Sequence, residues 1–410
     1  MPLFQEQLIR IAMVAAGFSG GQAEELRRAF GFKRSEARMR NIEVELREGM
    51  TKSGIVGEAQ DRIILSITSF ALYGFPESHA ASFALIAYAS AYLKCHYLAA
   101  FTAAMLNNQP MGFYHPSTLV KDAQRHGLKM KPIDITKSQF ECTLEPYSTQ
   151  RHRDTEMNKE RPSETLCDGG DRFAVRLGLN YVRGLREDAA RAIVEERDRG
   201  PFLSISDLAR RVPMLRKNEL VMLADVGALN AIGKNEKLHR RDALWQVERA
   251  ARHPGPLLEG IHELDQPSPL EIMTHEERLV ADFRGTGLTV GPHPMSYHRA
   301  EMNRRGIHPA ITLPKMQNGR YVKTAGCVIA RQRPGTAHGF VFLSLEDETG
   351  IANAIVTPDL FEKNRLLLVS ERFLLVEGIL QNIDNVVSVK ADKVMALDVT
   401  SAQTSSHDFH

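Results

Sequence analysis

The spacing of apolar residues predicts that the first quarter of the chain is α-helical. Apolar side chains recur every three or four positions between residues 5 and 47 and again between residues 57 and 107, which places them on one face of a helix. Glycines interrupt the first run at Gly17, Gly20, Gly21 and Gly31. Because glycine tends to end or break helices, we expect residues 1–115 to form several helices with short connections.

The segment YGFPESHAASFA, residues 73–84, predicts a sharp corner in this helical region. Pro76 cannot continue a preceding helix and Ser78 can cap the next one, which leaves His79 in its first turn. A helix N-terminus attracts anions, so a phosphate could bind here beside His79. The alternative is a plain corner whose histidine bonds a local carbonyl. The apolar run that follows is shorter than the roughly 20 residues of a membrane span, and we expect a buried helix.

From residue 321 onward, apolar and polar residues alternate, as they do in half-buried strands. Strands are expected at residues 322–333, 339–350, 351–358, 372–383 and 385–397, with a helix at 360–370. Five strands with a helix after the third match a small Greek-key barrel of the oligonucleotide/oligosaccharide-binding (OB) type, to which we assign residues 321–398. The tail, residues 399–410, is polar, and we expect it to be disordered.

Two groups of side chains in the predicted barrel have both a functional and a structural interpretation. The aromatic residues are Tyr321, Phe340, Phe342 and Phe373. Their rings can stack on single-stranded bases, but alternating aromatic residues in strands more often belong to the core, which we favour. The acidic run Glu346, Asp347 and Glu348 falls where a strand meets a turn, and we interpret it as a solvated hairpin loop.

The middle of the chain divides into three parts. Residues 116–171 are a connector that begins with a helix at Ser117 and ends in a polar stretch, residues 148–171, which we expect to be an exposed loop. Residues 172–250 form a second helical unit. Residues 251–320, whose first part is rich in proline and acidic residues, are expected to be a linker.

The second helical unit has the pattern of two helix-hairpin-helix motifs. The stretch LGLNYVRGLREDAARAIVEERDRG has a strand-like lead, a turn at Gly184 and a helix from about Glu187 to Arg199. A looser repeat follows, with a helix at Lys217 to Ala224 that Gly227 closes. Such turns expose backbone amides to DNA phosphates without reading bases. The expected DNA contacts are Arg183, Gly184, Arg186, Arg216 and Lys217. The alternative is a pair of αα-hairpins that serve packing only.

A cluster of basic residues surrounds Gly31 in the helical region. Its members are Arg27, Arg28, Lys33 and Arg34. Cations packed so closely along the chain can hold a phosphate chain by charge and bidentate hydrogen bonds. A solvated surface paired with Glu24 and Glu25 is the alternative.

Composition narrows the class of protein. Of the 410 residues, 43% are hydrophobic and 25% are charged, which is typical of a folded soluble protein with several domains. The net charge is +2, although residues 172–249 hold 16 Lys/Arg and 11 Asp/Glu, an excess that suits a polyanion. The four cysteines lack metal-ligand spacing and the N-terminus does not resemble a signal peptide, so we expect a cytoplasmic protein without a membrane anchor.

Several motifs of enzyme chemistry are missing or incomplete. Two-metal polymerases and nucleases need carboxylates that converge on one point, and the sequence indicates no such cluster. The glycines of GTGLTVG, residues 285–291, have the wrong spacing for a dinucleotide fingerprint, and there is no P-loop. We therefore expect no self-sufficient active site and no catalytic residue in this chain.

The chain resembles a known family over nearly its whole length. Two segments are similar to the fingers region of the bacterial C-family DNA polymerase III alpha subunit. They are MPLFQEQLIRIAMVAAGFSGGQAEELRRAFGFKR and YGFPESHAASFALIAYASAYLKCHYLAAFTAAMLNNQPMGFY. Three segments are most similar to the error-prone, damage-inducible branch of that family: NNQPMGFYHPSTLVKDAQRHG, RGTGLTVGPHPMSYHR and the closing SHDFH. The resemblance implies a multidomain α+β protein with α-helical fingers, a helix-hairpin-helix domain and a C-terminal five-stranded OB barrel.

The resemblance also implies roles for residues and partners. His79 and the basic cluster of Arg27, Arg28, Lys33 and Arg34 become candidate contacts to an incoming deoxynucleoside triphosphate or to the template. The family's palm, which carries the aspartates that bind Mg²⁺, would lie before Met1, so the ligands of Mg²⁺ are expected outside this chain. The implied partners are DNA, deoxynucleoside triphosphates, a palm-bearing chain and other replication or mutagenesis proteins.

Two functions compete at this point. The first is the C-terminal part of an error-prone DNA polymerase that binds template and nucleotide during translesion synthesis and damage-induced mutagenesis. The second is a non-catalytic DNA-binding module or an inactive polymerase remnant. A palm-bearing chain encoded just upstream would favour the first function.

Overall fold

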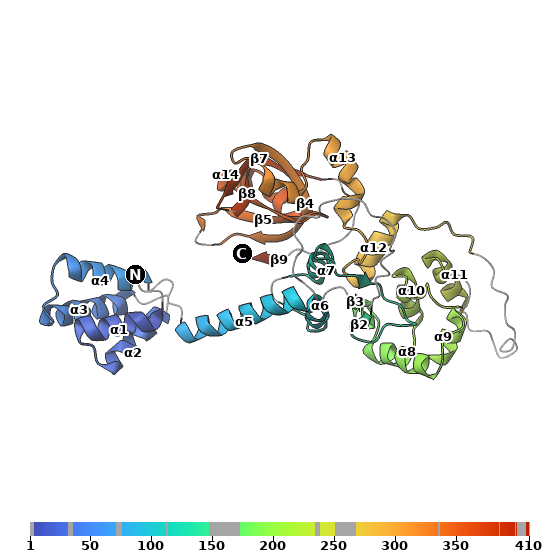
Figure 1. The fold of residues 1–410 in the computed structure, drawn as a ribbon, viewed down its shortest axis with the longest axis horizontal. Helices are drawn as coiled ribbons and strands as arrows, with labels where there is room; N and C mark the ends of the chain where they lie inside the picture. Colours follow the sequence, from blue (N-terminus) through green and yellow to red (C-terminus); the bar gives the residue numbers. More distant parts are fainter. Residues whose placement is uncertain are drawn as a thin grey trace, which may run out of the picture. The chain divides into compact units, whose positions relative to one another are not determined.

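The chain forms two compact units, Met1–Tyr92 and Leu93–His410. Figure 1 shows the computed structural model. It describes residues 4–31, 36–70, 76–111, 114–146, 173–233, 238–250, 268–334, 337–384, 386–397, 399 and 407–409.

The first unit is a group of helices around one small apolar core. Its helices are α1 (Gln5–Ala16), α2 (Gly20–Gly31), α3 (Glu36–Lys52), α4 (Glu58–Phe70) and most of α5 (Glu77–His96). Leu8, Leu26 and Met50 are fully buried and join the first three helices. α1 ends where Gly17 adopts a φ of 66°, a left-handed conformation that glycine adopts readily. The predicted helices and this predicted break are confirmed.

The prediction of a buried helix after the Gly-Pro corner is wrong. No residue of α5 is buried, and Leu85 and Tyr88 are 74% and 76% exposed. The helix begins at Glu77, so Ser78 is not its cap. The amide of Glu77 donates instead to the carboxylate of Glu6 at 2.9 Å. An alanine-rich run is apolar on all sides, and this pattern does not reveal whether a neighbour covers it.

The second unit begins with two helices and a small sheet. The helices are α6 (Leu98–Asn107) and α7 (Pro116–Arg125), which begins one residue before its predicted start. The sheet has β1 (Met130–Lys131), β2 (Thr143–Pro146) and β3 (Phe173–Arg176) in the order β1-β3-β2. The polar stretch predicted as an exposed loop, residues 148–171, lies outside the described residues.

The helix-hairpin-helix region follows the sheet directly. It contains the 3₁₀ helix η2 (Leu179–Tyr181), α8 (Glu187–Arg199), α9 (Ile205–Arg211), α10 (Lys217–Asp225) and α11 (Arg240–Ala250). α8 has its predicted bounds, and α10 is one residue longer than predicted. The helices share a core that includes Leu179, Ile193, Leu208 and Leu223, each fully buried.

The prediction of a linker over residues 251–320 is wrong where the structure describes it. Residues 268–320 contain α12 (His275–Thr286), α13 (Arg299–Arg304) and the 3₁₀ helices η3 (Pro294–His298) and η4 (Ala310–Lys315). α12 begins with a capping box, in which the Thr274 hydroxyl accepts from the Glu277 amide and the Glu277 carboxylate accepts from the Thr274 amide. These helices are short and separated by proline and glycine. The sequence therefore shows no long run in which apolar residues recur every three or four positions.

The C-terminal part of the second unit is the predicted barrel. Its strands are β4 (Tyr321–Gln332), β5 (Val341–Glu346), β6 (Ile351–Val356), β7 (Phe373–Ile383) and β8 (Val386–Ala396). They pair in the order β5-β6-β8-β7-β4, and pairing of β4 with β5 closes the sheet. Figure 1 shows the resulting barrel. Two short helices, α14 (Pro358–Lys363) and α15 (Arg365–Ser370), replace the single helix predicted after the third strand.

The expectation of a disordered tail is wrong for three of its residues. A short strand, β9 (His407–Phe409), pairs in parallel with residues 330–332 of β4. β4 offers a free edge there because its pairing with β7 ends at Cys327. β9 has only three residues, and its neighbours in the sequence are polar. The sequence therefore shows no alternation of apolar and polar residues that would predict a strand here.

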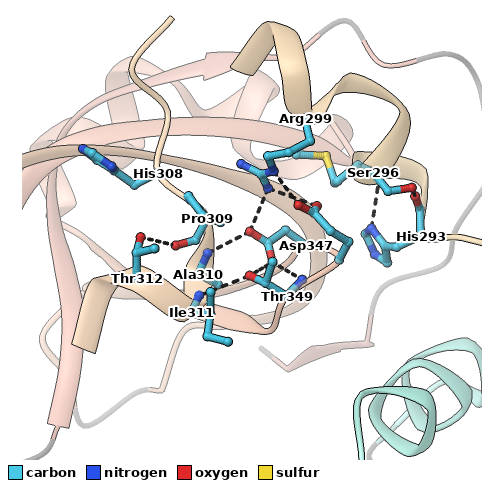
Figure 2. A network of polar contacts seen from close by, with 12 residues as sticks. His293, Ser296, Arg299, His308, Pro309, Ala310, Ile311, Thr312, Asp347 and Thr349 are labelled. Carbon is cyan, nitrogen blue, oxygen red and sulfur yellow. Dashed lines mark hydrogen bonds and ion pairs between the residues drawn. The ribbon is translucent and has the colours of Figure 1, made fainter. Parts of the chain in front are cut away.

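Two of the three acidic residues at the end of β5 are buried and the third, Glu348, is half-buried, so the interpretation of this run as a solvated loop is wrong. Glu346 and Asp347 are 3% and 1% exposed. Figure 2 shows Asp347 at the centre of a polar network, where its carboxylate accepts from Arg299 Nη2 at 3.0 Å and from the Ala310 amide at 2.8 Å. Arg125 of α7 lies 2.9 Å from Glu346. The run is hydrophilic but largely buried because partners from distant parts of the chain satisfy its charges.

Candidate nucleic-acid interface

Each predicted helix-hairpin-helix motif has a tight turn before its second helix. In the first motif, η2 leads through Arg183 and Gly184 into α8, and in the second, α9 leads through residues 212–216 into α10. Gly184 adopts a φ of 78°, and an added Cβ there would meet no atom within 4 Å. Glycine is therefore needed for the backbone conformation of the turn rather than for space.

One buried carboxylate joins the starts of α8 and α10. Glu219, 1% exposed, accepts from the backbone amide of Arg186 at 3.0 Å and from that of Arg216 at 2.8 Å. Arg186 and Arg216 are the N-cap residues of the two helices, so both helix N-termini lie next to each other. The first amides of a helix have no acceptor within it and carry partial positive charge. The pair is therefore a surface suited to neighbouring phosphates.

Arg186 belongs to this joint rather than to the open surface. Its guanidinium donates to both oxygens of Glu219, at 3.0 and 3.1 Å, and to the Met214 carbonyl at 2.6 Å. Burial opposes the charge on Glu219, but hydrogen bonds from Arg186 and the two amides outweigh it and hold the pKa of Glu219 below its ordinary value. We therefore assign Arg186 to the geometry of the turns and leave it out of the proposed DNA contacts.

The other predicted cations are exposed around the two turns. The amide of Arg183 donates to the Gly285 carbonyl at 2.7 Å, and its guanidinium lies at the end of α12. Among the residues that the structure describes, the guanidinium of Arg216 has no ion-pair partner. Lys217 lies 2.7 Å from Glu248, but the two side chains are 56% and 49% exposed, so this ion pair is weak.

Sequence reasoning missed two residues of this surface. Glu219 had a signal, because a glutamate at the third position of a helix is half of a capping box. Arg284 had none, because α12 lies in the predicted linker. Its side chain is 66% exposed and pairs with Asp225, while its carbonyl accepts from Arg183 at 3.4 Å. Arg284 therefore adds a cation beside the first turn.

The glycines of the GTG segment have packing roles. A Cβ at Gly285 would lie 2.2 Å from Val226 Cγ1, and a Cβ at Gly287 would lie 2.8 Å from Arg183 Nη2. Gly287 also ends α12 with a φ of 78°. These glycines allow α12 to approach the residues after α10 and the first turn closely, so their presence needs no dinucleotide ligand.

The predicted contacts in the fingers region are described only in part. Arg27 and Arg28 lie on α2, but their side chains are outside the described set, and so are Lys33 and Arg34 entirely. His79 is exposed in the first turn of α5, where its ring centroid lies 4.3 Å from that of Phe83. The proposed role of all these residues remains a prediction.

The aromatic residues of the barrel divide between core and surface. Phe373 is buried, as the core interpretation predicts. Phe340 is half-buried. Tyr321 and Phe342 are 52% and 36% exposed, so the core interpretation is wrong for these two rings.

The described ranges offer no group of three or more His, Cys, Asp or Glu side chains that could hold a metal ion. The residues in these ranges therefore do not fit the Mg²⁺ site that the resemblance implies. None of the helices in the same ranges is both long and apolar enough to cross a membrane.

Three family models match the chain. They describe a bacterial DNA polymerase III alpha subunit finger domain at residues 1–54, a helix-hairpin-helix motif at residues 127–239 and an OB-fold nucleic acid binding domain at residues 322–397. Among solved structures, asparaginyl-tRNA synthetase from Pyrococcus horikoshii is similar over 22% of this chain and 22% of its own, with 26% identity and a TM-score of 0.19. The family models confirm the predicted order of the three regions.

Curated relatives match along the whole chain. The error-prone DNA polymerase of Anaeromyxobacter sp. (strain K) is 42% identical over 411 residues, which cover 100% of this chain and 35% of the relative. Error-prone DNA polymerase 2 of Agrobacterium fabrum (strain C58 / ATCC 33970) is 38% identical over 417 residues, which cover 100% of this chain and 36% of the relative. This chain thus spans about a third of the length of the curated relatives it matches. It belongs to the error-prone branch of the bacterial C-family DNA polymerases.

Proposed function

We propose that this chain holds DNA for an error-prone polymerase during synthesis across damaged template. One observation carries the proposal: Glu219 joins the N-termini of α8 and α10, at the turns of the helix-hairpin-helix region. Such a surface holds phosphates without reading bases. Binding that ignores sequence suits an enzyme that must copy any template.

The proposed contribution of the chain is positioning. Nucleotidyl transfer is assisted by two Mg²⁺ ions on converging carboxylates, and we expect those carboxylates on a palm-bearing segment or chain. The helix-hairpin-helix turns would keep the duplex in place, while His79 and the basic cluster of the fingers region contact template and incoming deoxynucleoside triphosphate. A cytoplasmic location and further replication or mutagenesis proteins as partners belong to the same proposal.

A double substitution at the two turns tests the proposal. Arg183→Ala combined with Arg216→Ala removes one exposed cation from each turn. Each lost phosphate contact should reduce the slope of log affinity against log salt by about 0.9 for duplex DNA, so we expect a slope that is smaller by about 1.8. Fluorescence anisotropy of a labelled duplex in a salt series measures this slope.

The matched control removes the same charge elsewhere. Arg62 and Arg304 are exposed on α4 and α13, which are not part of the two turns. Arg62→Ala with Arg304→Ala should leave the slope unchanged. An equal loss of slope in both double variants, or no loss in either, would reject the turns as the DNA contact.

A further inference from the structure

The N-terminal half of α12 and the segment that leads into it are held without any buried side chain. None of residues 268–278 is buried, and Leu270 and Ile272 are 47% and 69% exposed. The buried side chains of α12 begin only at Leu279. Burial of apolar surface therefore contributes little to the position of this segment, which depends on polar contacts.

These polar contacts come from the start of α11. The guanidinium of Arg241 donates to the Glu271 carbonyl at 2.9 Å and to the Glu277 carboxylate at 2.6 Å. The guanidinium of Arg240 donates to the Arg278 carbonyl at 3.2 Å. An arginine side chain stays protonated in proteins, so these two donors keep their charge at any pH at which the chain is folded.

His239, the residue before α11, contributes a contact that can titrate. Its Nε2 accepts from the Met273 amide at 3.2 Å and lies 3.2 Å from Arg278 Nη2. Because an amide N–H and a guanidinium can only donate, Nε2 is the ring nitrogen without a proton and the imidazole is neutral. We call residues 239–241 the α12 latch.

The surroundings of the His239 ring oppose its protonation. The cations near it are Arg278 of α12 and Arg240 and Arg241 of α11. Two acids lie close by: Asp242, whose carboxylate accepts from the His239 amide at 3.3 Å, and Glu277, which is paired with Arg241. Burial of the ring, followed by the charge of Arg278, outweighs Asp242 and lowers the pKa of His239 below its ordinary value of 6.5.

We propose that the α12 latch is a pH-sensitive switch, which holds residues 271–278 on α11 while the His239 ring is neutral and releases them when a proton from solvent binds Nε2. Protonation turns Nε2 from an acceptor into a donor, so the Met273 amide loses its partner. It also places a charged imidazolium 3.2 Å from the Arg278 guanidinium. The latch is therefore closed above pH 6.5, and it opens as the pH falls below this value towards the lowered pKa of the closed state.

The other end of α12 supports the first hairpin turn, which gives the switch a consequence for DNA. The Gly285 carbonyl accepts from the Arg183 amide at 2.7 Å, and the Arg183 side chain lies against Gly287. Release of the N-terminal half of α12 loosens the helix that holds this turn. This consequence rests on the proposed function, whereas the switch itself does not.

Hydrogen exchange in the full chain tests the switch. Mass spectrometry follows peptides that cover residues 271–278 at about pH 7.5 and about pH 5.5, on either side of the ordinary titration of histidine, with correction for the intrinsic pH dependence of exchange. In the unaltered chain, protection of this segment should be lower at the acidic pH by about 3-fold or more.

Two substitutions at His239 should fix the switch in its two states. His239→Gln supplies a side-chain oxygen that can accept from the Met273 amide but does not titrate, so protection should be equal at both pH values. His239→Lys places a permanent cation beside Arg278, so protection should be low at both pH values.

His275→Gln is the matched control within the same segment. His275 is exposed in the first turn of α12, so this variant loses a titratable imidazole and keeps the latch. Its protection should fall at the acidic pH as in the unaltered chain. Equal protection of the unaltered chain at both pH values, or a fall in His239→Gln as large as in the unaltered chain, would overturn the switch.

Duplex binding at the same two pH values separates the switch from the proposed function. We expect affinity to fall more at the acidic pH in the unaltered chain than in His239→Gln. Loss of protection at the acidic pH without duplex binding at either pH would support the switch and reject the turns. Duplex binding that depends on Arg183 and Arg216, with protection that does not respond to pH, would overturn the switch and leave the proposed function intact.

Discussion

At the scale of single residues, Glu219 determines the geometry of a surface to which it contributes almost no exposed area. An ionised carboxylate has enough lone pairs to accept from two amides and a bidentate guanidinium. Glu219 uses them for the amides of Arg186 and Arg216 and for the side chain of Arg186. The distance between the starts of α8 and α10 therefore depends on one side chain.

Glu219→Ala is expected to lower the free energy of unfolding by about 2–3 kcal/mol, because it leaves buried donors without an acceptor. Urea or thermal unfolding followed by circular dichroism measures the change. Glu248→Ala is the control, since it removes only the half-exposed partner of Lys217 and should change stability by less than about 1 kcal/mol. Equal changes in the two variants would contradict the role of Glu219 as the joint.

At the scale of elements, the sequence predicts those whose pattern is local. The bounds of α8 follow from the turn at Gly184 and from the apolar spacing after it, and the alternation after residue 321 predicts all five barrel strands. The exposure of α5 and the burial of Asp347 are not predictable in this way. Asp347 is buried because Arg299, 48 positions away, bonds its carboxylate.

The candidate site shows the same division. The positions of Arg183, Gly184 and Arg216 at turns follow from the motif. The use of Arg186 within the joint does not, because its partner Glu219 lies 33 positions away and meets it only in the folded chain. Hydrophobic periodicity carries no information on which polar side chains pair across elements.

The small sheet is an element whose stability should depend on pH. Glu145 on β2 bonds Arg176 on β3, and Lys131 Nζ on β1 lies 2.5 Å from its other oxygen. Hydrogen bonding from Arg176, with a smaller contribution from Lys131 and against the effect of burial, lowers the pKa of Glu145 from 4.5 to about 2. A carboxyl whose pKa is lower in the folded state stabilises the fold above its unfolded pKa, and this stabilisation is lost as the pH falls from 4.5 towards 2.

Glu145→Gln is therefore expected to lower the free energy of unfolding by about 2–3 kcal/mol at neutral pH. The difference from the unaltered chain should shrink below pH 4.5 and nearly vanish at pH 2. Urea unfolding at a series of pH values measures this difference, with the exposed Glu141→Gln as control. A difference that does not change across this range would contradict the ion cluster.

At the scale of the molecule, α12 and the segment after it connect the helix-hairpin-helix turns with the barrel inside the second unit. The C-terminal end of α12 packs on the first hairpin turn, where Gly285 accepts from the amide of Arg183. The segment that follows leads through η3 to Arg299, which bonds the buried acidic run of β5. The hairpin turns and the barrel therefore belong to one compact unit.

The most direct test of this account is the salt dependence of duplex binding by the unaltered chain. Fluorescence anisotropy would be measured with two labelled duplexes of unrelated sequence, from about 50 to about 200 mM salt. We predict that log affinity falls linearly with log salt and with the same slope for both duplexes. Binding that prefers one sequence, binding that does not respond to salt, or no binding at the lowest salt concentration would contradict the account.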